Sequence, residues 1–523
     1  MTHAMPDSSG NENGARGGPF HHLIWYAATV FVSSACLLVL EIVAGRLLAP
    51  YVGVSLYTWT AIIGVILAGL SLGNWLGGVW ADRGGGEYAV GFTLLAAGAA
   101  SLGILLLLTW IAPLVNEQRF GLLGTSFILV LTLFFAPALL LGVVTPILTT
   151  LALQLPLRTG RVVGTLHALA ALGSIAGTFL TGYLLIQYLG TRLVVFGTAL
   201  TLVGLGLPFL RGRLRSGIAL VTIALVPLLW LGWQRGAFSN PCQHESGYFC
   251  IRVVDSSRDA PYGEARSLIL DHLLHGTNHR EDPQLLLAPY VHLLDELLND
   301  ALRLEKIDTP RVFFGGGGAY TQPRAVAARF PGAEVVVAEI DPVVTAVARD
   351  SLYLNTADMR VHHTDARLAL ASYAENYFDA VVTDVFKDVA IPYHLVTKEY
   401  AQLVHERLRD GGLYVLNVVD VFPDARFAKS LMKTLGAVFE HVHVYLHELP
   451  KQPQRVTLVV AASDRYVSPQ VVRSRNGPPR HWLRITEPLL ATGTPLEALP
   501  LLSDDHAPVE RLISTLLVSE AGL

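Results

Sequence analysis

Predicted strand ends in the second half of the chain carry residues that can bind a nucleoside. The glycine run Gly315–Gly318 follows one apolar run, and glycines allow a sharp turn and a close approach of the backbone to a ligand. Glu339 ends the next run, where a carboxylate can accept both hydroxyls of a ribose. Asp365 and Asp384 follow two later runs. Because ligands of doubly wound sheets bind beyond the carboxyl ends of the strands, these positions predict a nucleoside site.

Each of these residues also has an ordinary structural interpretation. The glycine run can be only a tight turn, Glu339 and Asp341 can cap the helix that follows them, and Asp365 can cap its own helix. Their occurrence at successive strand ends favours the binding site. No Lys-Ser or Lys-Thr follows the glycines, so the run is not a Walker loop and a phosphate-bearing ligand is disfavoured.

The elements that must position these residues are short apolar strands alternating with helices. The strands are expected at 311–314, 334–339, 378–384 and 412–418, and the helices at 321–330, 342–350, 366–375 and 397–408. Such strands indicate a parallel sheet that is covered on both faces. The runs at 440–446 and 455–461 lack an obvious helix between them and are expected to pair antiparallel. A small β-meander is expected at 248–254 and 266–270, followed by an amphipathic helix at 285–304.

The first half of the chain has the composition of a membrane domain. Of the 523 residues, 52% are hydrophobic and 15% are charged, against roughly 25% charged in soluble domains. A bilayer span needs about 20 apolar residues. Seven spans are predicted, at 23–48, 55–80, 89–113, 125–151, 163–187, 193–210 and 216–233. Gly69, Gly73 and Gly77, like Gly173, Gly177 and Thr181, recur every fourth residue, which predicts closely packed helix backbones.

The predicted fold class is therefore a multi-pass α-helical membrane domain joined to an α/β Rossmann-like domain of the methyltransferase type, which a small β-meander precedes. The predicted parts are a disordered tail (1–21), the transmembrane domain (22–233), the meander and helix (234–305), the nucleoside-binding domain (306–465) and a C-terminal extension (466–523).

Charge and cysteine content exclude several classes of function. The net charge is −4 and there is no basic block, so nucleic-acid binding is not expected. Three cysteines exclude a disulfide-rich scaffold, and the absence of a CxxC or His/Cys cluster predicts no metal. Five histidines lack the spacing of metal ligands and are expected to be surface or capping groups: His275, His279, His292, His394 and His506.

From Glu245 onward the chain resembles the spermidine synthase, or polyamine aminopropyltransferase, family in its membrane-fused form. The matching pieces are Glu245–Tyr248, Leu270–Asp271, Tyr290, Gly315–Gly318, Val337–Asp341, Asp365–Ala366, Asp384, Ile391–Leu395 and Ser503–Glu510. In the first half, Leu40–Pro50 is similar to a span of those fused proteins. No single piece is specific, but their order is.

The resemblance implies a role for each matching residue. Glu339 would hold the ribose of decarboxylated S-adenosylmethionine, the co-substrate; no prosthetic group and no metal are implied. Asp384 would be the catalytic carboxylate, with Tyr290 beside the acceptor amine. The remaining assignments are Asp365 and Ala366 at the adenine, Gly316, Gly317 and Gly318 under the thioether, and Tyr248, Asp271 and Tyr393 at the substrate.

Three departures concern the part of the site that holds the amines. Ala319 stands where soluble members have an Asp that contacts the amino group of the donor. Phe249 replaces a Gln, and Val291 replaces a polar residue. A cation without a carboxylate partner is costly to bury. The donor tail or the acceptor can therefore differ from those of the family.

The resemblance implies a membrane-anchored aminopropyltransferase that converts a diamine such as putrescine to spermidine and releases methylthioadenosine. Alternatives are another transfer from S-adenosylmethionine, of a methyl or aminocarboxypropyl group, or an amine transporter or sensor with a regulatory nucleoside domain. The expected partners are a small amine, the lipid bilayer and, as in soluble relatives, a second copy in a homodimer.

The side of the membrane on which the second half lies is open. Over seven spans, the loops on the N-terminal side hold more arginines, which places the N-terminus in the cytoplasm and the second half outside. Cys242 and Cys250 could pair in such an oxidising compartment. The co-substrate is kept inside cells, which instead favours a cytoplasmic catalytic domain at the inner membrane. An eighth span would remove the conflict.

Overall fold

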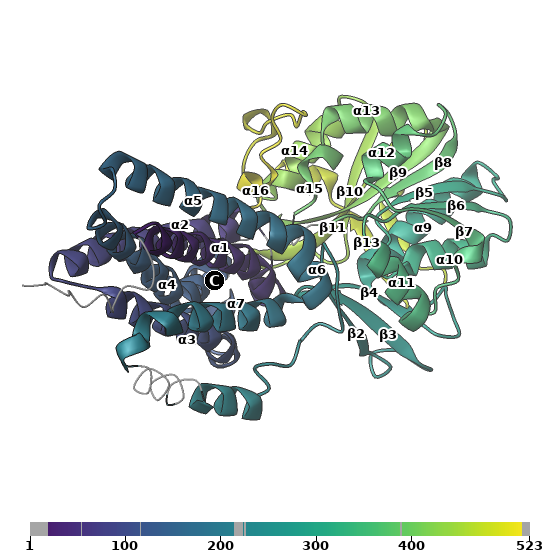
Figure 1. The fold of residues 1–523 in the computed structure, drawn as a ribbon. Helices are drawn as coiled ribbons and strands as arrows, with labels where there is room; N and C mark the ends of the chain where they lie inside the picture. Colours follow the sequence, from purple (N-terminus) through teal and green to yellow (C-terminus); the bar gives the residue numbers. More distant parts are fainter. Residues whose placement is uncertain are drawn as a thin grey trace, which may run out of the picture. The chain divides into compact units, whose positions relative to one another are not determined.

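The structure is a computed structural model that describes residues 19–53, 55–115, 117–213, 223, 226–386 and 390–514. The chain divides into two compact units (Figure 1). The helical unit comprises Met1–Ala44, Ile62–Trp110 and Val130–Phe238, and the α/β unit comprises Gly45–Ala61, Ile111–Leu129 and Ser239–Leu523.

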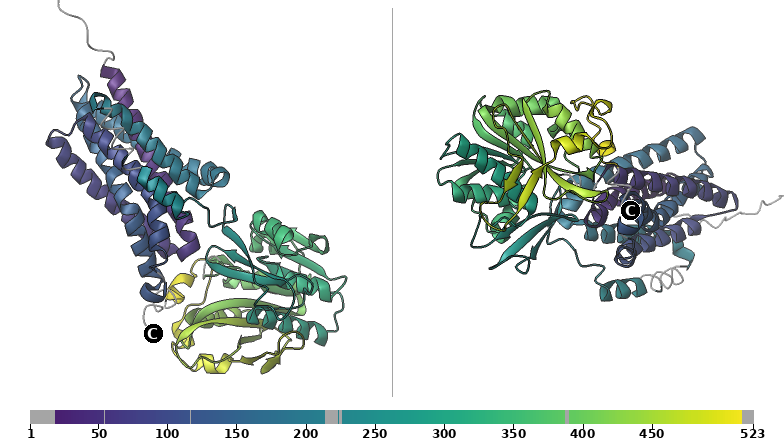
Figure 2. Two further views of the ribbon diagram at one scale, coloured as in Figure 1. Left: turned by 90° about the horizontal axis from the view of Figure 1, so that it is seen from below. Right: turned by 180° about the vertical axis from the view of Figure 1, so that it is seen from behind.

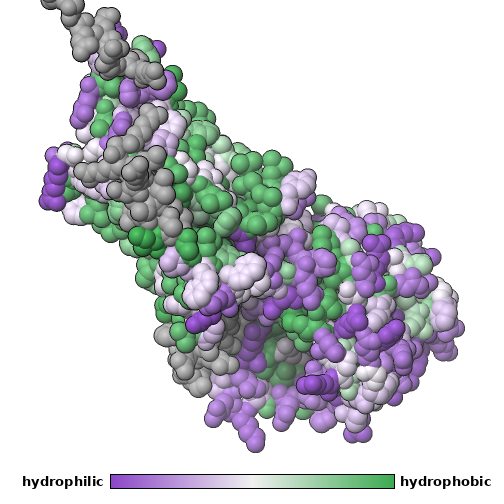
Figure 3. Space-filling view, turned by 60° about the horizontal axis from the view of Figure 1, so that its bottom comes forward, coloured by the Kyte–Doolittle hydropathy of each residue, from purple (hydrophilic) through white to green (hydrophobic). Residues whose placement is uncertain are grey.

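The first half of the chain forms long apolar helices. They are α1 (Pro19–Val52), α2 (Leu56–Asp82), α3 (Glu87–Ile111), α4 (Glu117–Leu153), α5 (Thr159–Leu180), the π-helical turn η1 (Thr181–Leu185), α6 (Ile186–Leu189), α7 (Thr191–Gly206) and the 3-10 helix η2 (Leu207–Arg213). Within the described residues, six stretches are long and apolar enough to span a membrane: Phe20–Val52, Leu56–Asp82, Glu87–Ile111, Leu123–Leu153, Thr159–Leu189 and Thr191–Leu210. Figure 3 shows hydrophobic residues over the surface of this part.

These six stretches coincide with the first six predicted spans and confirm that those segments are long apolar helices. The seventh, at 216–233, lies largely outside the described residues, although residues 226–234 are helical. The small residues pack as their spacing predicts. A Cβ on Gly73 would lie 2.1 Å from the carbonyl oxygen of Leu139 in α4, and one on Gly173 would lie 2.1 Å from that of Phe31 in α1. Glycine is therefore required where these helix backbones meet.

A small antiparallel sheet begins the second half of the chain, where the β-meander is predicted. Its strands are β1 (His244–Glu245), β2 (Cys250–Asp255), β3 (Ala265–Leu270) and β4 (Leu273–His279), in the order β1-β2-β3-β4. Helix α9 (Pro289–Leu304) follows. A disulfide joins Cys242 to Cys250, whose Cα atoms are 5.2 Å apart.

The main sheet has nine strands in the order β12-β13-β10-β11-β9-β8-β5-β6-β7. The strands are β5 (Arg311–Gly315), β6 (Glu334–Ala338), β7 (Met359–His362), β8 (Phe378–Thr383), β9 (Leu408–Phe422), β10 (His441–Leu446), β11 (Gln454–Ser463), β12 (Val471–Arg473) and β13 (His481–Arg484). Strands β5 to β9 pair parallel with one another, and β9 pairs antiparallel with β11 on its other side. Strands β10 and β11 pair antiparallel, as predicted.

Helices cover both faces of the parallel strands. In Figures 1 and 2, α9, α10 (Thr321–Arg329) and α11 (Pro342–Ser351) lie along one face, and α12 (Ala366–Ala371), α13 (Lys398–Arg407) and α14 (Arg426–Leu435) along the other. All six residues of β8 are buried, which explains the unbroken apolar run. The remaining elements are η3 (Thr356–Asp358), η4 (Tyr393–Leu395), α15 (Thr486–Leu490), η5 (Leu496–Ala498) and α16 (Val509–Leu512).

Two features of this fold were not predicted. The first is helix α14, which follows β9. Its sequence carries a signal for a helix, because Phe427, Leu431 and Leu435 recur every fourth residue and are buried on one side of it. Strands β12 and β13 join the main sheet, so the sheet continues beyond the domain boundary expected at residue 465.

The disulfide predicts how the three cysteines react with a thiol reagent. In protein purified from its own membrane without reductant, we expect Cys242 and Cys250 to be labelled only after reduction. Because the bridge closes a short loop of sequence separation 8, replacing both with Ser should lower the free energy of unfolding by about 2 kcal/mol. Mass spectrometry and thermal unfolding measure these effects. Cys36→Ser is the control, because Cys36 is free; labelling of all three cysteines without reduction would contradict the bridge.

Candidate active site

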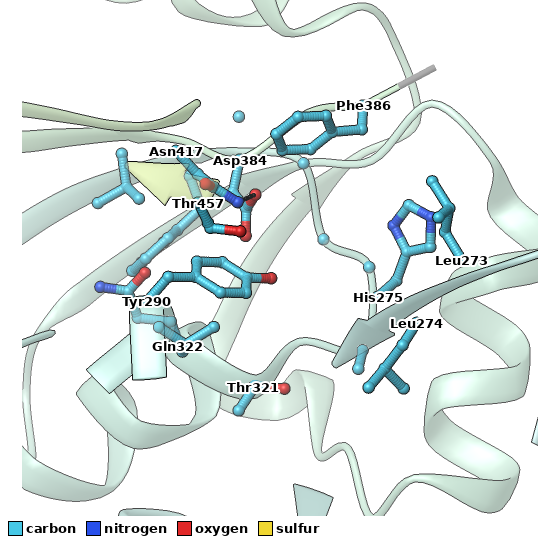
Figure 4. A pocket seen from close by; sticks show the side chains of 18 of the residues that line it. Leu273, Leu274, His275, Tyr290, Thr321, Gln322, Asp384, Phe386, Asn417 and Thr457 are labelled. Carbon is cyan, nitrogen blue, oxygen red and sulfur yellow. Dashed lines mark hydrogen bonds between the residues drawn. The ribbon is translucent and has the colours of Figure 1, made fainter. Parts of the chain in front are cut away.

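A pocket opens at the carboxyl ends of the parallel strands, where the sequence predicts a site (Figure 4). Its lining combines the glycine loop after β5 with the end of β8, the start of α9 and residues of β4, β9 and β11. The lining residues are Leu273, Leu274, His275, Tyr290, Val291, Phe314, Gly315–Gly318, Ala319, Thr321, Gln322, Pro323, Val382, Asp384, Phe386, Asn417, Val419, Arg455 and Thr457.

Asp384 is held in this pocket by polar groups from three elements. The Nδ2 of Asn417 in β9 donates to its Oδ1 at 3.1 Å. The hydroxyl of Tyr290, at the start of α9, donates to the same carboxylate, and its ring lies beside Asp384 in Figure 4. The backbone N–H of Asp384 donates to the carbonyl of Gly315 at 2.9 Å. These contacts fix the carboxylate above the glycine loop.

Burial controls the ionisation of the two central groups. It raises the pKa of Asp384 to about 6, against the hydrogen bonds from Asn417 and Tyr290, which favour the ionised form. Burial, followed by the charge of Asp384, raises the pKa of Tyr290 well above its ordinary value, so the phenol remains a neutral donor at neutral pH. The pair can therefore accept a proton at the carboxylate near physiological pH.

The glycine loop passes directly against the end of β8. Gly316 has a φ of +93°, and a Cβ on it would lie 2.4 Å from the carbonyl oxygen of Asp384. No other residue fits this position without moving one of the two backbones. The loop then enters α10 through Tyr320, whose φ is +59° and whose hydroxyl shares a hydrogen bond of 2.7 Å with Thr345.

Glu339 supports the loop from the end of β6. Its Oε2 accepts from the N–H groups of Gly317 at 2.9 Å and Gly318 at 3.1 Å, and its Oε1 accepts from Asp341 at 3.0 Å. Burial raises its pKa against these backbone hydrogen bonds. Glu339 is not one of the residues that line the pocket, but a carboxylate has about four acceptor positions and retains the capacity to bind a further hydroxyl.

Asp365 and Asp341 act as helix caps, which is the structural role that the sequence also allows for both residues. Asp365 Oδ1 accepts from the N–H of Arg367 at 2.8 Å, and its Oδ2 lies 2.7 Å from Nε2 of His394. Asp341 accepts from the N–H of Val343 at 2.9 Å and thereby caps α11. Neither residue lines the pocket.

The other predicted ligand residues also lie outside the pocket lining. Ala366 is buried beside Gly315, whose added Cβ would lie 3.4 Å from it. Asp271 is buried and accepts from the N–H of Cys250 at 2.9 Å. Tyr248 and Tyr393 are 48% and 58% exposed. The structure thus brings together Asp384, Tyr290 and Gly316–Gly318 from the predicted set.

The expectation that five histidines are surface or capping groups is wrong for two of them. His292 is buried, and His275 lines the pocket, where burial lowers its pKa to about 4. His275 is therefore neutral at pH 7. His279 is buried but caps a turn, since its Nδ1 accepts from the N–H of Asp282 at 2.9 Å. Among the residues that the structure describes, no group of three metal-ligating side chains is found.

Sequence reasoning missed five polar residues of the pocket: Thr321, Gln322, Asn417, Arg455 and Thr457. Asn417 interrupts an apolar strand near its carboxyl end, which is a signal that could have identified it. Arg455 and Thr457 lie on β11, the antiparallel neighbour of β9. No local sequence pattern marks these two residues. They reach the pocket only because β11 pairs with β9, which lies far from it in the sequence.

Residues 308–472 match the family model described as "Spermine/spermidine synthase domain". These residues form a spermine/spermidine synthase domain. The pocket of this synthase domain contains the glycine loop and Asp384 that the resemblance singled out.

Curated relatives match the same part of the chain. A "Probable polyamine aminopropyl transferase" of Bifidobacterium longum is 25% identical over 228 residues, which cover 40% of this chain and 50% of that protein. A "Polyamine aminopropyltransferase" of Vibrio vulnificus is 32% identical over 110 residues, 20% of this chain and 37% of that protein. An "eEF1A lysine and N-terminal methyltransferase" of Xenopus laevis is 30% identical over 149 residues, 27% of this chain and 21% of that protein. The chain spans half or less of the length of each.

The close contact at Gly316 predicts how replacement of this glycine by alanine affects the stability of the protein. Gly316→Ala should lower the free energy of unfolding by roughly 1–3 kcal/mol, because its positive φ and the Asp384 carbonyl both oppose a Cβ. Thermal unfolding measures this effect. Gly247→Ala is the matched control, since nothing lies within 4 Å of its added Cβ; equal behaviour of both variants would contradict the close contact.

Proposed function

We propose that the chain is a membrane-anchored aminopropyltransferase that uses decarboxylated S-adenosylmethionine to alkylate an amine. The observation that carries the proposal is the position of Asp384. It lies at the end of β8 against the glycine loop, with Tyr290 and Asn417 as donors, inside a spermine/spermidine synthase domain. A diamine such as putrescine would give spermidine.

The chemistry that the site must supply is removal of a proton and alignment of two reactants. The sulfonium of the donor is a good leaving group and needs no acid. An alkyl amine, with a solution pKa near that of lysine at about 10.4, is protonated at neutral pH and is not nucleophilic. Asp384 accepts one proton from the ammonium and leaves a lone pair on nitrogen. The nitrogen then bonds to the donor carbon, and the electrons of the broken carbon–sulfur bond go to sulfur as methylthioadenosine leaves.

The residues around the loop are proposed to hold the donor. Glu339 would accept the ribose hydroxyls, Asp365 and Ala366 would contact the adenine, and Gly316–Gly318 would lie under the thioether. Holding both reactants in line supplies much of the remaining acceleration. At the acceptor end the proposed contacts are Tyr290, Tyr248, Asp271 and Tyr393.

The proposed setting is the inner cell membrane. The six candidate spans support a multi-pass protein. Use of an intracellular co-substrate supports a synthase domain on the cytoplasmic side of the membrane. The disulfide and the arginine distribution support a synthase domain on the outer side. We retain the proposed division into a transmembrane domain at 22–233 and catalytic parts after it. A homodimer, as in soluble relatives, remains part of the proposal.

A second candidate function is transfer from S-adenosylmethionine itself, of a methyl or an aminocarboxypropyl group. Two observations favour it. Ala319 leaves no carboxylate in the loop to repel that of the donor, and two of the matching relatives are methyltransferases. Products distinguish the reactions, because methyl transfer releases S-adenosylhomocysteine, whereas the other transfers release methylthioadenosine.

Turnover by purified protein tests the proposed function. With decarboxylated S-adenosylmethionine and a panel of diamines, we expect methylthioadenosine and a new polyamine, detected by mass spectrometry. Asp384→Asn should lower kcat by about 100-fold or more, because the amide cannot accept the proton. Asp410→Asn is the control, since Asp410 pairs with Arg465 at the surface. Absence of product with every diamine would refute aminopropyl transfer to diamines.

The pKa of Asp384 predicts the pH dependence of that turnover. Only the ionised carboxylate can accept a proton, so kcat/KM should show a midpoint near pH 6 and fall about tenfold per unit at lower pH. The Asn417 hydrogen bond favours the ionised form. Asn417→Ala should therefore move this midpoint to higher pH. A midpoint that stays near pH 6 in the Asn417 variant would show that another group is responsible.

A further inference from the structure

The synthase pocket contains a cation that its proposed chemistry does not use. Arg455 lines the same pocket as Asp384. On β11 it is two residues from Thr457, so both side chains point to the same face of the sheet. Their partners on β9 are Val421 and Val419, and Val419 also lines the pocket. Arg455 is exposed to solvent, which places it at the mouth of the pocket.

The described lining of the pocket carries one negative and one positive charge. Among the described residues that line it, Asp384 and Arg455 are the two that carry charge at neutral pH. His275 is neutral because burial lowers its pKa to about 4. A diamine would bring two ammonium groups to one carboxylate and one guanidinium. A substrate that carries both an ammonium and a carboxylate would match both protein charges.

Buried polar groups without partners add to this pattern. Within the described residues, the Nε2 of Gln322 and the Oδ1 of Asn417 have no hydrogen-bond partner, and the two residues are 5% and 3% exposed. Both line the pocket. An amide NH₂ donates to a carboxylate, and an amide oxygen accepts from an ammonium. A buried polar group left unpaired is costly, so a ligand with both functions satisfies each of them.

We propose that Arg455 binds a carboxylate of one of the two substrates, so that the pocket selects a substrate of the amino-acid type. This inference rests on the proposed function, since it concerns the same pocket. The carboxylate has two sources. It belongs either to the donor, as in S-adenosylmethionine, or to the acceptor, as in a diamino acid.

The transfer balances in both cases. The amine nitrogen bonds to the carbon next to sulfur, the carbon–sulfur bond breaks, its electrons go to sulfur, and one ammonium proton goes to Asp384. With S-adenosylmethionine the transferred group is 3-amino-3-carboxypropyl. With a decarboxylated donor it is aminopropyl, and the product keeps the carboxylate of the acceptor. Methylthioadenosine leaves in both cases.

Two pairs of ligands, each differing by a single carboxylate, test the proposal. The donor pair is S-adenosylmethionine and its decarboxylated form, and the acceptor pair is ornithine and putrescine. Calorimetry on the full chain in detergent measures their Kd, and turnover measures KM and kcat separately. The variants are Arg455→Ala and, as control for the loss of a surface arginine, Arg465→Ala, whose side chain pairs with Asp410.

In one of the two pairs, we expect the ligand with the carboxylate to bind more tightly than the ligand without it. Arg455→Ala should raise the Kd of the carboxylate-bearing ligand about tenfold and change the Kd of the other ligand of that pair less than twofold. The affected pair identifies the source of the carboxylate. Arg455→Lys should restore part of the loss, and Arg465→Ala should have no effect.

The proposal is overturned if the carboxylate-free member binds more tightly in both pairs, or if Arg455→Ala weakens both members of a pair equally. If the protein nevertheless converts putrescine with the decarboxylated donor, this inference fails but the proposed function does not. If none of the four ligands binds, the proposed function fails together with this inference.

Discussion

The close contact between the glycine loop and the end of β8 determines the geometry of the candidate site. Strands β5 and β8 are parallel neighbours, so their carboxyl ends meet. The N–H of Asp384 bonds to the carbonyl of Gly315, and the space beside the Asp384 carbonyl is filled by Gly316, where no Cβ fits. This contact brings the carboxylate over the loop on which the donor is proposed to lie. Glu339 supports the same loop through two backbone N–H groups.

Asp384 shows how burial and hydrogen bonding act against each other. Removal from water favours the protonated carboxyl, while Asn417 and Tyr290 favour the ionised form. The result is a carboxylate whose pKa of about 6 lies closer to neutral pH than that of a free aspartate. A stronger base near the working pH accepts a proton more readily, which suits the removal of a proton from an ammonium.

Among its described residues, the pocket combines apolar side chains with the carboxylate of Asp384 and the guanidinium of Arg455. Ala319 and Val291 are apolar, and both line the pocket. Phe249 packs against the core of the α/β unit. Arg455 adds a positive charge from a strand that local sequence patterns do not connect with the site.

The sequence by itself determined the strands and the site residues that a local pattern of residue types identifies. Strands β5, β6 and β8 were predictable because burial on both faces requires unbroken apolar runs, and the carboxyl-end rule then located Asp384 and the glycine loop. Helix α14 had the spacing of a buried face, yet its lysines and arginine obscured it. The tertiary structure alone decided which polar residues join Asp384 in the pocket. Asn417 reaches Asp384 through the pairing of β8 with β9, and Arg455 reaches the pocket through the pairing of β9 with β11. The register between strands far apart in the chain depends on packing that no local pattern records.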